Sequence, residues 1–214
     1  MRLGWMGCVI MVLGCGSADA DEALVANAPV PIEQGMRAAV GAPAPDFVLP
    51  AVDGTLVRLS DFAGQTVVLE WFNPGCPFVK EVYNEDKMTD LAARWAAQGV
   101  QWLAINSGAA GKQGSGVSTN RRAADRWDIP YPVLLDESGA VGRTYGAQTT
   151  PHMYIIGPDG NLAFSGAFSN APLGNVDGEQ EVNHVDVALE ALREGQPVEN
   201  TAPKPWGCSV KYGS

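Results

Sequence analysis

The chain has 214 residues, of which 46% are hydrophobic and 18% charged, and its formal net charge at pH 7 is −10. This length suits one globular domain with flanking segments, and the composition is that of an ordinary soluble protein. The excess of negative charge argues against nucleic acid or an anionic membrane surface as a partner. Because the body of the chain lacks an apolar run of about 18 residues, no internal membrane-spanning helix is expected.

Residues 1–20 have the features of a secretory signal, because Arg2 gives a basic start and residues 8–16 are almost wholly apolar. Two cleavage sites compete. Cleavage before Cys15, within a segment that resembles a bacterial lipobox, would leave that cysteine lipidated, whereas residues 18–20 fit ordinary signal peptidase. A cytosolic chain with an apolar N-terminal helix is the remaining alternative. We expect an exported protein, periplasmic or lipid-anchored in the bacterial cell envelope, with no other attachment to the membrane.

The next segments lead from a linker into a globular pattern. Residues 21–40 are rich in Ala, Pro, Glu and Asp without periodicity and predict a flexible linker. Apolar residues on both sides of a turn at 52–54 predict a β-hairpin, followed by a short helical turn capped by Ser60. Residues 66–72 are apolar except for Glu70, which predicts a central strand buried on both faces.

Helices and strands alternate through the rest of the domain. A helix begins at Pro77, a residue favoured at the first helical position, and Gly99 ends it. Its apolar residues recur at helical spacing and predict one buried face: Phe78, Val82, Met88, Leu91 and Trp95. The later elements are strands at 100–105 and 132–135, helices at 120–127, 141–145 and 185–193, and a hairpin at 153–156 and 162–165. A Gly/Ser-rich stretch at 106–118 predicts a mobile loop, and 167–183 an irregular insertion.

This order of elements predicts an α/β protein, a three-layer α/β/α sandwich on a mixed central sheet with an N-terminal hairpin extension. The sandwich occupies residues 41–195. Residues 196–214 are rich in proline and predict an extended C-terminal tail, which carries Cys208.

Cys76 is the first candidate for chemistry, because it follows the central strand and a Pro-Gly turn, and Pro77 then opens the helix. Free N–H groups and the dipole at a helix N-terminus favour the thiolate, which is the nucleophile in redox chemistry. The alternative is a buried structural cysteine. Cys8 lies in the predicted signal, and Cys15 is either removed or lipidated. Two thiols, Cys76 and Cys208, are then left in an oxidising compartment, where thiols tend to pair.

Three motifs point to a known family: Cys-Pro-Phe-Val-Lys at 76–80, Thr-Pro-His at 150–152, and Gly-Cys-Ser-Val-Lys-Tyr at 207–212. With these motifs, residues 41–212 resemble the redoxin branch of the thioredoxin-like superfamily. The resemblance is to a peroxiredoxin-like group related to alkyl hydroperoxide reductase and thiol-specific antioxidant (AhpC/TSA) proteins. It implies a thioredoxin-like fold and thiol-based redox chemistry without a cofactor or a bound metal.

The resemblance also implies a role for each matching position. Cys76 aligns with the first, nucleophilic cysteine of the thioredoxin Cys-x-x-Cys motif, and Val79 stands at the second cysteine position. Thr150-Pro151 resembles the cis-proline loop that lies against the nucleophile, and with Pro77 it would contact the substrate. Because Val79 replaces the second cysteine, the motif itself contains no resolving thiol.

Two charged residues near Cys76 complete the catalytic candidates. Glu70 stands where thioredoxins place a buried acid that moves protons, and burial in an apolar strand should raise its pKa. Lys80 belongs to the first motif. In the alternative interpretation, Glu70 pairs with Lys80 and has only a structural role.

The sequence departs from the peroxidase members of this family. Peroxiredoxins carry a Pro-x-x-x-Thr/Ser-x-x-Cys motif and an arginine, which together polarise the peroxide. Here Asn73 stands three residues before Cys76, Leu69 stands seven before it, and no arginine adjoins residues 150–152. Resemblance to the family therefore does not bring peroxidase chemistry with it.

Cys208 is the candidate resolving thiol. The chain from Gly195 to Cys208 reaches roughly 40 Å when extended, and a domain of this size has a radius of gyration of about 15 Å. The tail can therefore bring Cys208 to Cys76, where it would resolve a mixed disulfide. Cys208 could instead pin the tail as a static disulfide or be a free thiol. A third option gathers Cys76, Cys208, His152 and Met153 as soft ligands for Cu(I).

The sequence thus favours an exported thiol–disulfide oxidoreductase. Its substrates would be protein or small-molecule thiols and disulfides, and its electron donor a thiol protein. A peroxiredoxin-like thiol peroxidase and a non-enzymatic redox or copper-binding carrier are the alternatives.

Overall fold

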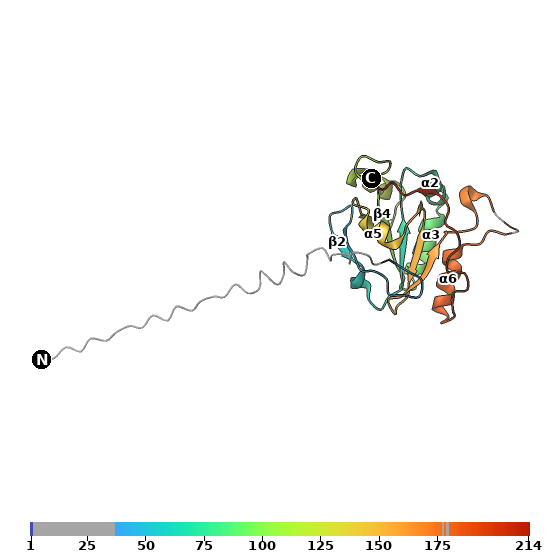
Figure 1. The fold of residues 1–214 in the computed structure, drawn as a ribbon, viewed down its shortest axis with the longest axis horizontal. Coiled ribbons are helices and arrows are strands. Elements are labelled where there is room, and N and C mark those ends of the chain that lie inside the picture. The colour runs from blue at the N-terminus through green and yellow to red at the C-terminus, as the bar shows by residue number, and fades with distance from the viewer. Residues whose placement is uncertain (2–36, 177, 179) are drawn as a thin grey trace.

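The structure is a computed structural model that describes Met1, residues 37–176, residue 178 and residues 180–214. The predicted signal segment, the lipidation candidate Cys15 and most of the predicted linker lie outside the described residues. Within the described part of the chain, no helix combines the length and apolar character needed to cross a bilayer. From residue 37 onward the chain folds around a central sheet (Figure 1).

The central sheet has five strands in the order β5-β4-β3-β7-β8. These strands are β3 (Val67–Trp71), β4 (Gln101–Asn106), β5 (Val133–Leu135), β7 (Met153–Ile156) and β8 (Leu162–Gly166). β4 runs parallel to both β3 and β5, whereas β7 runs antiparallel to both β3 and β8. The prediction of a mixed central sheet is confirmed.

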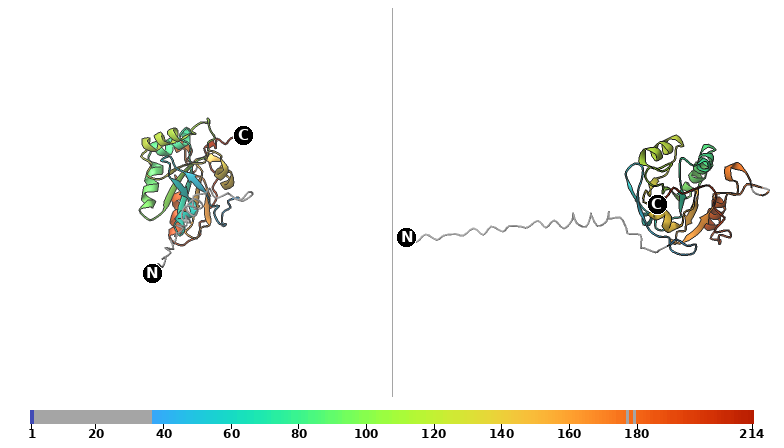
Figure 2. Two further views of the ribbon diagram at one scale, coloured as in Figure 1. Left: turned by 90° about the vertical axis from the view of Figure 1, so that its left-hand side faces the viewer. Right: turned by 45° about the horizontal axis from the view of Figure 1, so that its top comes forward.

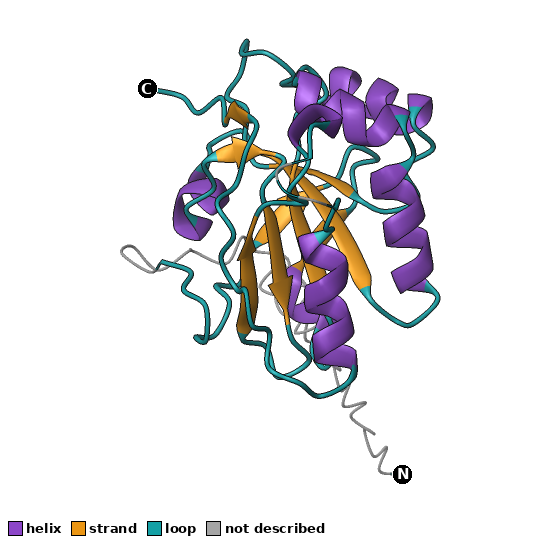
Figure 3. Cartoon of the chain, turned by 90° about the vertical axis from the view of Figure 1, so that its right-hand side faces the viewer, coloured by secondary structure: helices purple, strands orange, loops and turns teal. Residues whose placement is uncertain are grey.

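Helices cover both faces of the sheet (Figures 2 and 3). They are α2 (Pro77–Asn84), α3 (Lys87–Ala96), α4 (Val117–Arg126), α5 (Ala140–Tyr145) and α6 (His184–Arg193). Val68 and Phe72 face a core shared with α2, α3, α4 and α6, whereas Leu69 and Trp71 face a second core shared with α5. Because both faces are covered, the central strand is apolar at nearly every position.

An N-terminal hairpin packs on the second core, as the sequence predicts. It pairs β1 (Val48–Pro50) with β2 (Leu56–Arg58) in antiparallel register, and the 3₁₀ helix η1 (Leu59–Phe62) follows. The prediction that Ser60 caps this helix is wrong, because Ser60 lies inside it. The Ser60 hydroxyl and N–H instead donate to the Asp46 carboxylate, at 2.9 and 3.0 Å.

Two helices, α2 and α3, stand where one continuous helix is predicted. The break lies at Asp86, whose φ of 55° is left-handed. Aspartate is one of the few residues besides glycine that enter this region readily, so the helix can stop there. The predicted buried face survives the break, since all its members except the half-buried Phe78 are buried: Val82, Met88, Leu91 and Trp95.

The Gly/Ser-rich stretch after β4, predicted to be a mobile loop, is held in place by side-chain hydrogen bonds. The amides of Asn106 and Asn120 donate to the Gly114 carbonyl, at 2.9 and 3.0 Å. The Gln113 amide donates to the Gly75 carbonyl at 3.2 Å. The loop is thereby tied to the end of β4 and to the turn that precedes α2.

The C-terminal tail is extended, as predicted, and it follows a fixed route over the domain. It first runs beside β8, where the Ala167 N–H donates to the Pro203 carbonyl at 3.0 Å. It then forms β9 (Cys208–Ser209), which pairs in antiparallel register with β6 (Thr149–Thr150). The tail therefore returns to the carboxyl end of the central sheet.

Gly207 permits the close approach of β9 to β6. Its φ of 131° is one that residues with a side chain rarely adopt, and an added Cβ would lie 2.2 Å from the Thr150 carbonyl oxygen. A side chain at this position would have to push the two strands apart.

We predict that Gly207→Ala loosens the tail. Strain at such a backbone position costs about 1–3 kcal/mol, so amide exchange in residues 208–212 should accelerate by roughly tenfold or more. Hydrogen–deuterium exchange read by mass spectrometry measures this. Gly64→Ala is the matched control, because Gly64 also has a positive φ, of 81°, but has open space around its Cβ position. Equal exchange of the tail in both variants would contradict the prediction.

Candidate redox-active site

The turn after β3 places Cys76 at the start of α2. The Gly75 N–H donates to the Asn73 side-chain oxygen at 2.8 Å, and the Cys76 N–H donates to the Asn73 backbone oxygen at 3.0 Å. Pro77 occupies the first turn of α2, where a missing N–H removes no helical bond. Cys76 is the N-cap residue of the helix, as the sequence predicts.

The Cys76 sulfur lies against the loop that precedes β7. Cys76 has 0% exposure, and its Sγ lies 3.1 Å from the Thr150 carbonyl oxygen. The Thr150–Pro151 peptide bond is cis. Thr150 is also the direct partner of Cys208 in the pairing of β6 with β9. Two cysteines from distant parts of the sequence therefore meet here, both as free thiols.

The two thiols differ in acidity. Burial raises the pKa of the Cys76 thiol, but hydrogen bonds from the Cys208 thiol and the Val79 N–H outweigh it, so the pKa lies below its ordinary value. Burial raises the pKa of Cys208 to about 11, and the hydrogen bond to Cys76 and the charge of Cys76 add to this effect. Of the two thiols, Cys76 is therefore the one whose thiolate the site favours.

Glu70 lies fully buried on β3 among neutral hydrogen-bond donors. Its Oε2 accepts from the Tyr83 hydroxyl at 2.8 Å, and from Trp102 Nε1 and the Tyr131 hydroxyl at 3.4 Å each. Its Oε1 has no hydrogen-bond partner among the described residues. Burial raises the pKa of Glu70 to about 7, and the three donors only partly oppose it. A carboxyl group with this pKa can exchange a proton near neutral pH.

The alternative in which Glu70 pairs with Lys80 is wrong. Lys80 is exposed on α2, whereas Glu70 has 0% exposure and neutral partners. The Tyr83 hydroxyl also lies 2.9 Å from that of Tyr131, which is half-buried. The two hydroxyls and the Glu70 carboxyl therefore form one hydrogen-bonded cluster.

Both ring nitrogens of His152 lie near hydroxyl groups, so the ring is not arranged as a copper ligand. Its Nδ1 lies 3.1 Å from the Tyr154 hydroxyl and its Nε2 lies 3.5 Å from the Ser165 hydroxyl. Burial lowers the pKa of His152 to about 4, so the ring is neutral. In the part of the chain that the structure describes, no three His, Cys, Asp or Glu residues are grouped as metal ligands. The geometry gives no support to the copper-carrier alternative.

The positions that replace the peroxidase motif serve the architecture. Leu69 packs in the second core, on the opposite side of the sheet from Cys76. Asn73 is buried and holds the turn before Cys76, and its amide donates to the Gln113 carbonyl at 3.2 Å. The groups that interact with the Cys76 sulfur are Thr150, Val79 and Cys208, and no arginine is among them in the described chain.

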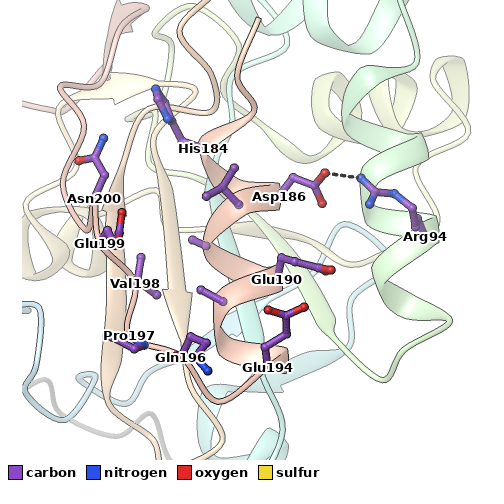
Figure 4. A pocket seen from close by; sticks show the side chains of 13 residues that line it. Arg94, His184, Asp186, Glu190, Glu194, Gln196, Pro197, Val198, Glu199 and Asn200 are labelled. Carbon is purple, nitrogen blue, oxygen red and sulfur yellow. Dashed lines mark ion pairs between the residues drawn. The ribbon is translucent and has the colours of Figure 1, made fainter.

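A separate hollow of about 740 Å³ lies between α6 and the start of the tail (Figure 4). Its lining includes the ion pair of Arg94 with Asp186, 2.9 Å apart, and the half-buried His184. None of the predicted site residues lines it. The thiol chemistry therefore lies at a different place from this hollow.

Several residues around the thiols escape prediction from the sequence. Tyr83 stands seven residues after Cys76 on the same helix, a spacing that places both on one face, but nothing in the sequence links it to Tyr131. Phe78 and Trp206 pack together with ring centroids 5.8 Å apart, which anchors the tail on α2. That Trp206 and Tyr212, which flank Cys208, dock the tail is what the sequence predicts; that Phe78 is the partner of Trp206 is not.

Comparisons with known proteins agree with this geometry. Residues 40–165 match the AhpC/TSA family. The thiol-disulfide oxidoreductase ResA of Geobacillus thermodenitrificans is 31% identical over 125 residues, which is 58% of this chain and 67% of that protein. The match to the family ends before Cys208.

Solved structures extend the similarity. A hypothetical protein from Sinorhizobium meliloti has a TM-score of 0.74 at 27% identity, covering 82% of this chain and 96% of its own. An uncharacterized conserved protein from Geobacillus kaustophilus gives 0.73 at 32% identity, covering 82% and 93%. The thioredoxin domain of a thiol-disulfide oxidoreductase from Bacteroides vulgatus gives 0.50 at 18% identity, covering 59% and 87%. The predicted thioredoxin-like fold is confirmed.

We predict that Glu70→Gln changes the pH dependence of stability. The unfolded chain titrates this carboxyl near 4.5 and the folded chain near 7. The stabilisation of the folded protein that the raised pKa of Glu70 provides is therefore fully present below pH 4.5 and is lost as pH rises through 7. Relative to the variant, the wild-type protein should lose about 3 kcal/mol of unfolding free energy across this window.

Urea denaturation of both proteins between pH 4 and 8 measures the difference. Subtraction cancels the other titrating groups, including His152, whose buried neutral ring acts in the opposite direction. A difference that stays constant with pH would show that Glu70 titrates normally in the folded protein.

Proposed function

The chain belongs to the AhpC/TSA family, and we propose on that premise that it is an exported thiol–disulfide oxidoreductase. Cys76 is the nucleophile and Cys208 the resolving cysteine. The observation that carries this proposal is the pairing of Thr150 with Cys208, which brings the second thiol within hydrogen-bonding reach of the first. Relatives named thiol-disulfide oxidoreductase support the same reaction class.

The first chemical step is attack on a disulfide. The Cys76 thiolate attacks one sulfur of the substrate, a mixed disulfide forms on Cys76, and the other substrate sulfur leaves as a thiolate that takes up a proton. The lowered pKa of Cys76 raises the fraction of this thiol that is in the reactive thiolate form.

Formation of the mixed disulfide activates the second thiol. Burial is the largest cause of the raised pKa of Cys208 and remains, but the bond neutralises Cys76, so the hydrogen bond and the charge that add to it both disappear. Cys208 then loses its proton, attacks Cys76 and releases the second substrate thiolate. The protein is left with a Cys76–Cys208 disulfide, and two electrons have passed to the substrate. A thiol protein would restore the pair by the same exchange.

Glu70 is proposed as the acid that stores and returns these protons, since it is fully buried on the strand that leads to Cys76 and burial raises its pKa to about 7. Thr150, Pro151 and Pro77 border the nucleophile and are the proposed substrate contacts. Lys80 is exposed one helical turn beyond Cys76, where it can meet a substrate but not Glu70.

The proposed location is the periplasm or a lipid anchor on the bacterial cell envelope. The signal-like character of residues 1–20 and the lipobox-like segment before Cys15 support export. Protein or small-molecule disulfides are the proposed substrates. Neither a cofactor nor nucleic acid has a part in this chemistry.

A thiol peroxidase is the second candidate, and membership of the AhpC/TSA family is what favours it. Asn73 stands where the peroxidase threonine or serine would polarise a peroxide, and its amide is already engaged with Gln113. Disulfide exchange needs no such polarising group, so it fits the site better.

We predict that Cys76→Ser abolishes reduction of hydroxyethyl disulfide by dithiothreitol, since the nucleophile is lost. Cys208→Ala should retain the first attack but accumulate the mixed disulfide, with turnover at least tenfold lower, because resolution then depends on free thiol. Ser209→Ala, the adjacent change on β9, is the control and should turn over normally. Steady-state rates and intact-protein mass spectra read both outcomes.

Unchanged turnover by Cys76→Ser would end the proposal. Hydrogen peroxide, offered in place of the disulfide, distinguishes a thiol peroxidase from a disulfide oxidoreductase. Faster consumption of peroxide than of disulfide, with a sulfenic acid trapped on Cys76, would favour the peroxidase.

A further inference from the structure

A second hollow, of about 620 Å³, lies between α2 and α4 beside the turn that leads into Cys76. Pro74, two residues before the nucleophile, lines one edge together with Lys80. Arg122 and Arg126 of α4 line the other edge. The hollow therefore lies beside the turn that precedes Cys76 and extends to the neighbouring helix.

This hollow is positively charged on a chain whose net charge is −10. Lys80, Arg122 and Arg126 are exposed, and none of them forms an ion pair with any residue that the structure describes. Asp125 is the carboxylate among the lining residues. A local positive surface on an acidic protein attracts negative partners to that place and repels them elsewhere, so it also sets their orientation.

Trp127 also lines this hollow, and two contacts hold its apolar ring in place. It is half-buried, it stacks on Tyr83 with ring centroids 4.9 Å apart, and its Nε1 donates to the Asn84 side chain at 2.9 Å. Tryptophan and arginine are the side chains most enriched at the energetic centres of protein interfaces. A fixed tryptophan among unpaired cations is therefore suited to a protein partner.

We infer that the hollow between α2 and α4 docks a redox partner protein whose disulfide is flanked by carboxylates. The inference rests on the proposed disulfide exchange, because the partner's disulfide must reach Cys76 while its adjoining surface covers α2 and α4. The cations stand on two helices, Lys80 on α2 and Arg122 and Arg126 on α4, so they match several carboxylates spread over a surface. Lys80, Arg122 and Arg126 pair with these carboxylates, and Trp127 packs against the apolar part of the partner.

Two synthetic peptides with the same disulfide loop test this inference, one flanked by three glutamates and the other by three glutamines. The wild-type protein should reduce the glutamate peptide with a kcat/KM about tenfold higher at low ionic strength, and added salt should erase the preference. Arg122→Gln/Arg126→Gln should bring the ratio close to one. Arg37→Gln/Arg193→Gln removes the same charge from residues that do not line the hollow, and should keep the ratio.

A ratio that is equal in all three proteins would overturn the inference, as would an equal loss in the control variant, which would indicate net charge alone. Oxidised glutathione is the third substrate. If the Arg122→Gln/Arg126→Gln variant loses activity toward oxidised glutathione while its glutamate-to-glutamine peptide ratio stays that of the wild-type protein, the occupant is a small anionic disulfide. The partner-protein assignment would then be wrong. Failure of the wild-type protein to reduce even the glutamine peptide would instead count against disulfide exchange itself.

Discussion

Backbone pairing between Thr149–Thr150 and Cys208–Ser209 brings the end of the chain to the nucleophile. The tail is fixed on both sides of this pairing: Trp206 packs on Phe78 before it, and the Tyr212 hydroxyl donates to the Ala147 carbonyl at 2.9 Å after it. Most of the entropy of bringing two distant thiols together is therefore lost on folding and not in the reaction. An in-motif partner is unnecessary once the tail is fixed, which explains how Val79 can stand at the usual second cysteine position.

Burial sets the second constraint, because Cys76 has 0% exposure, although Cys208 is only half-buried. Neutral hydrogen-bond donors, and not a nearby cation, favour the Cys76 thiolate over the thiol. The proposed exchange also needs a group that takes up and returns protons. Glu70 is suited to that role, since burial raises its pKa to about 7 and its Oε1 has no described partner.

The sequence predicts the parts of this site that depend on local pattern. An apolar run followed by Pro-Gly-Cys-Pro places Cys76 at a helix start, and Thr150-Pro151 marks the loop against it. Contacts between distant segments are beyond such a prediction. The break at Asp86 depends on how two short helices pack, and the Tyr83–Tyr131 contact depends on where β5 lies relative to α2. Chain length shows that Cys208 can reach Cys76, but only the strand pairing shows that it does.

Mapping the disulfide of the oxidised protein tests the central claim most directly. After oxidation at low protein concentration, trypsin digestion and mass spectrometry without reduction should yield one linked peptide pair that joins Cys76 to Cys208, from a protein that stays monomeric on non-reducing electrophoresis. Reduction should then release two thiols per mature chain. Two free thiols after oxidation, or a Cys76–Cys208 link found only in disulfide-bonded dimers, would contradict the account of a redox pair within one chain.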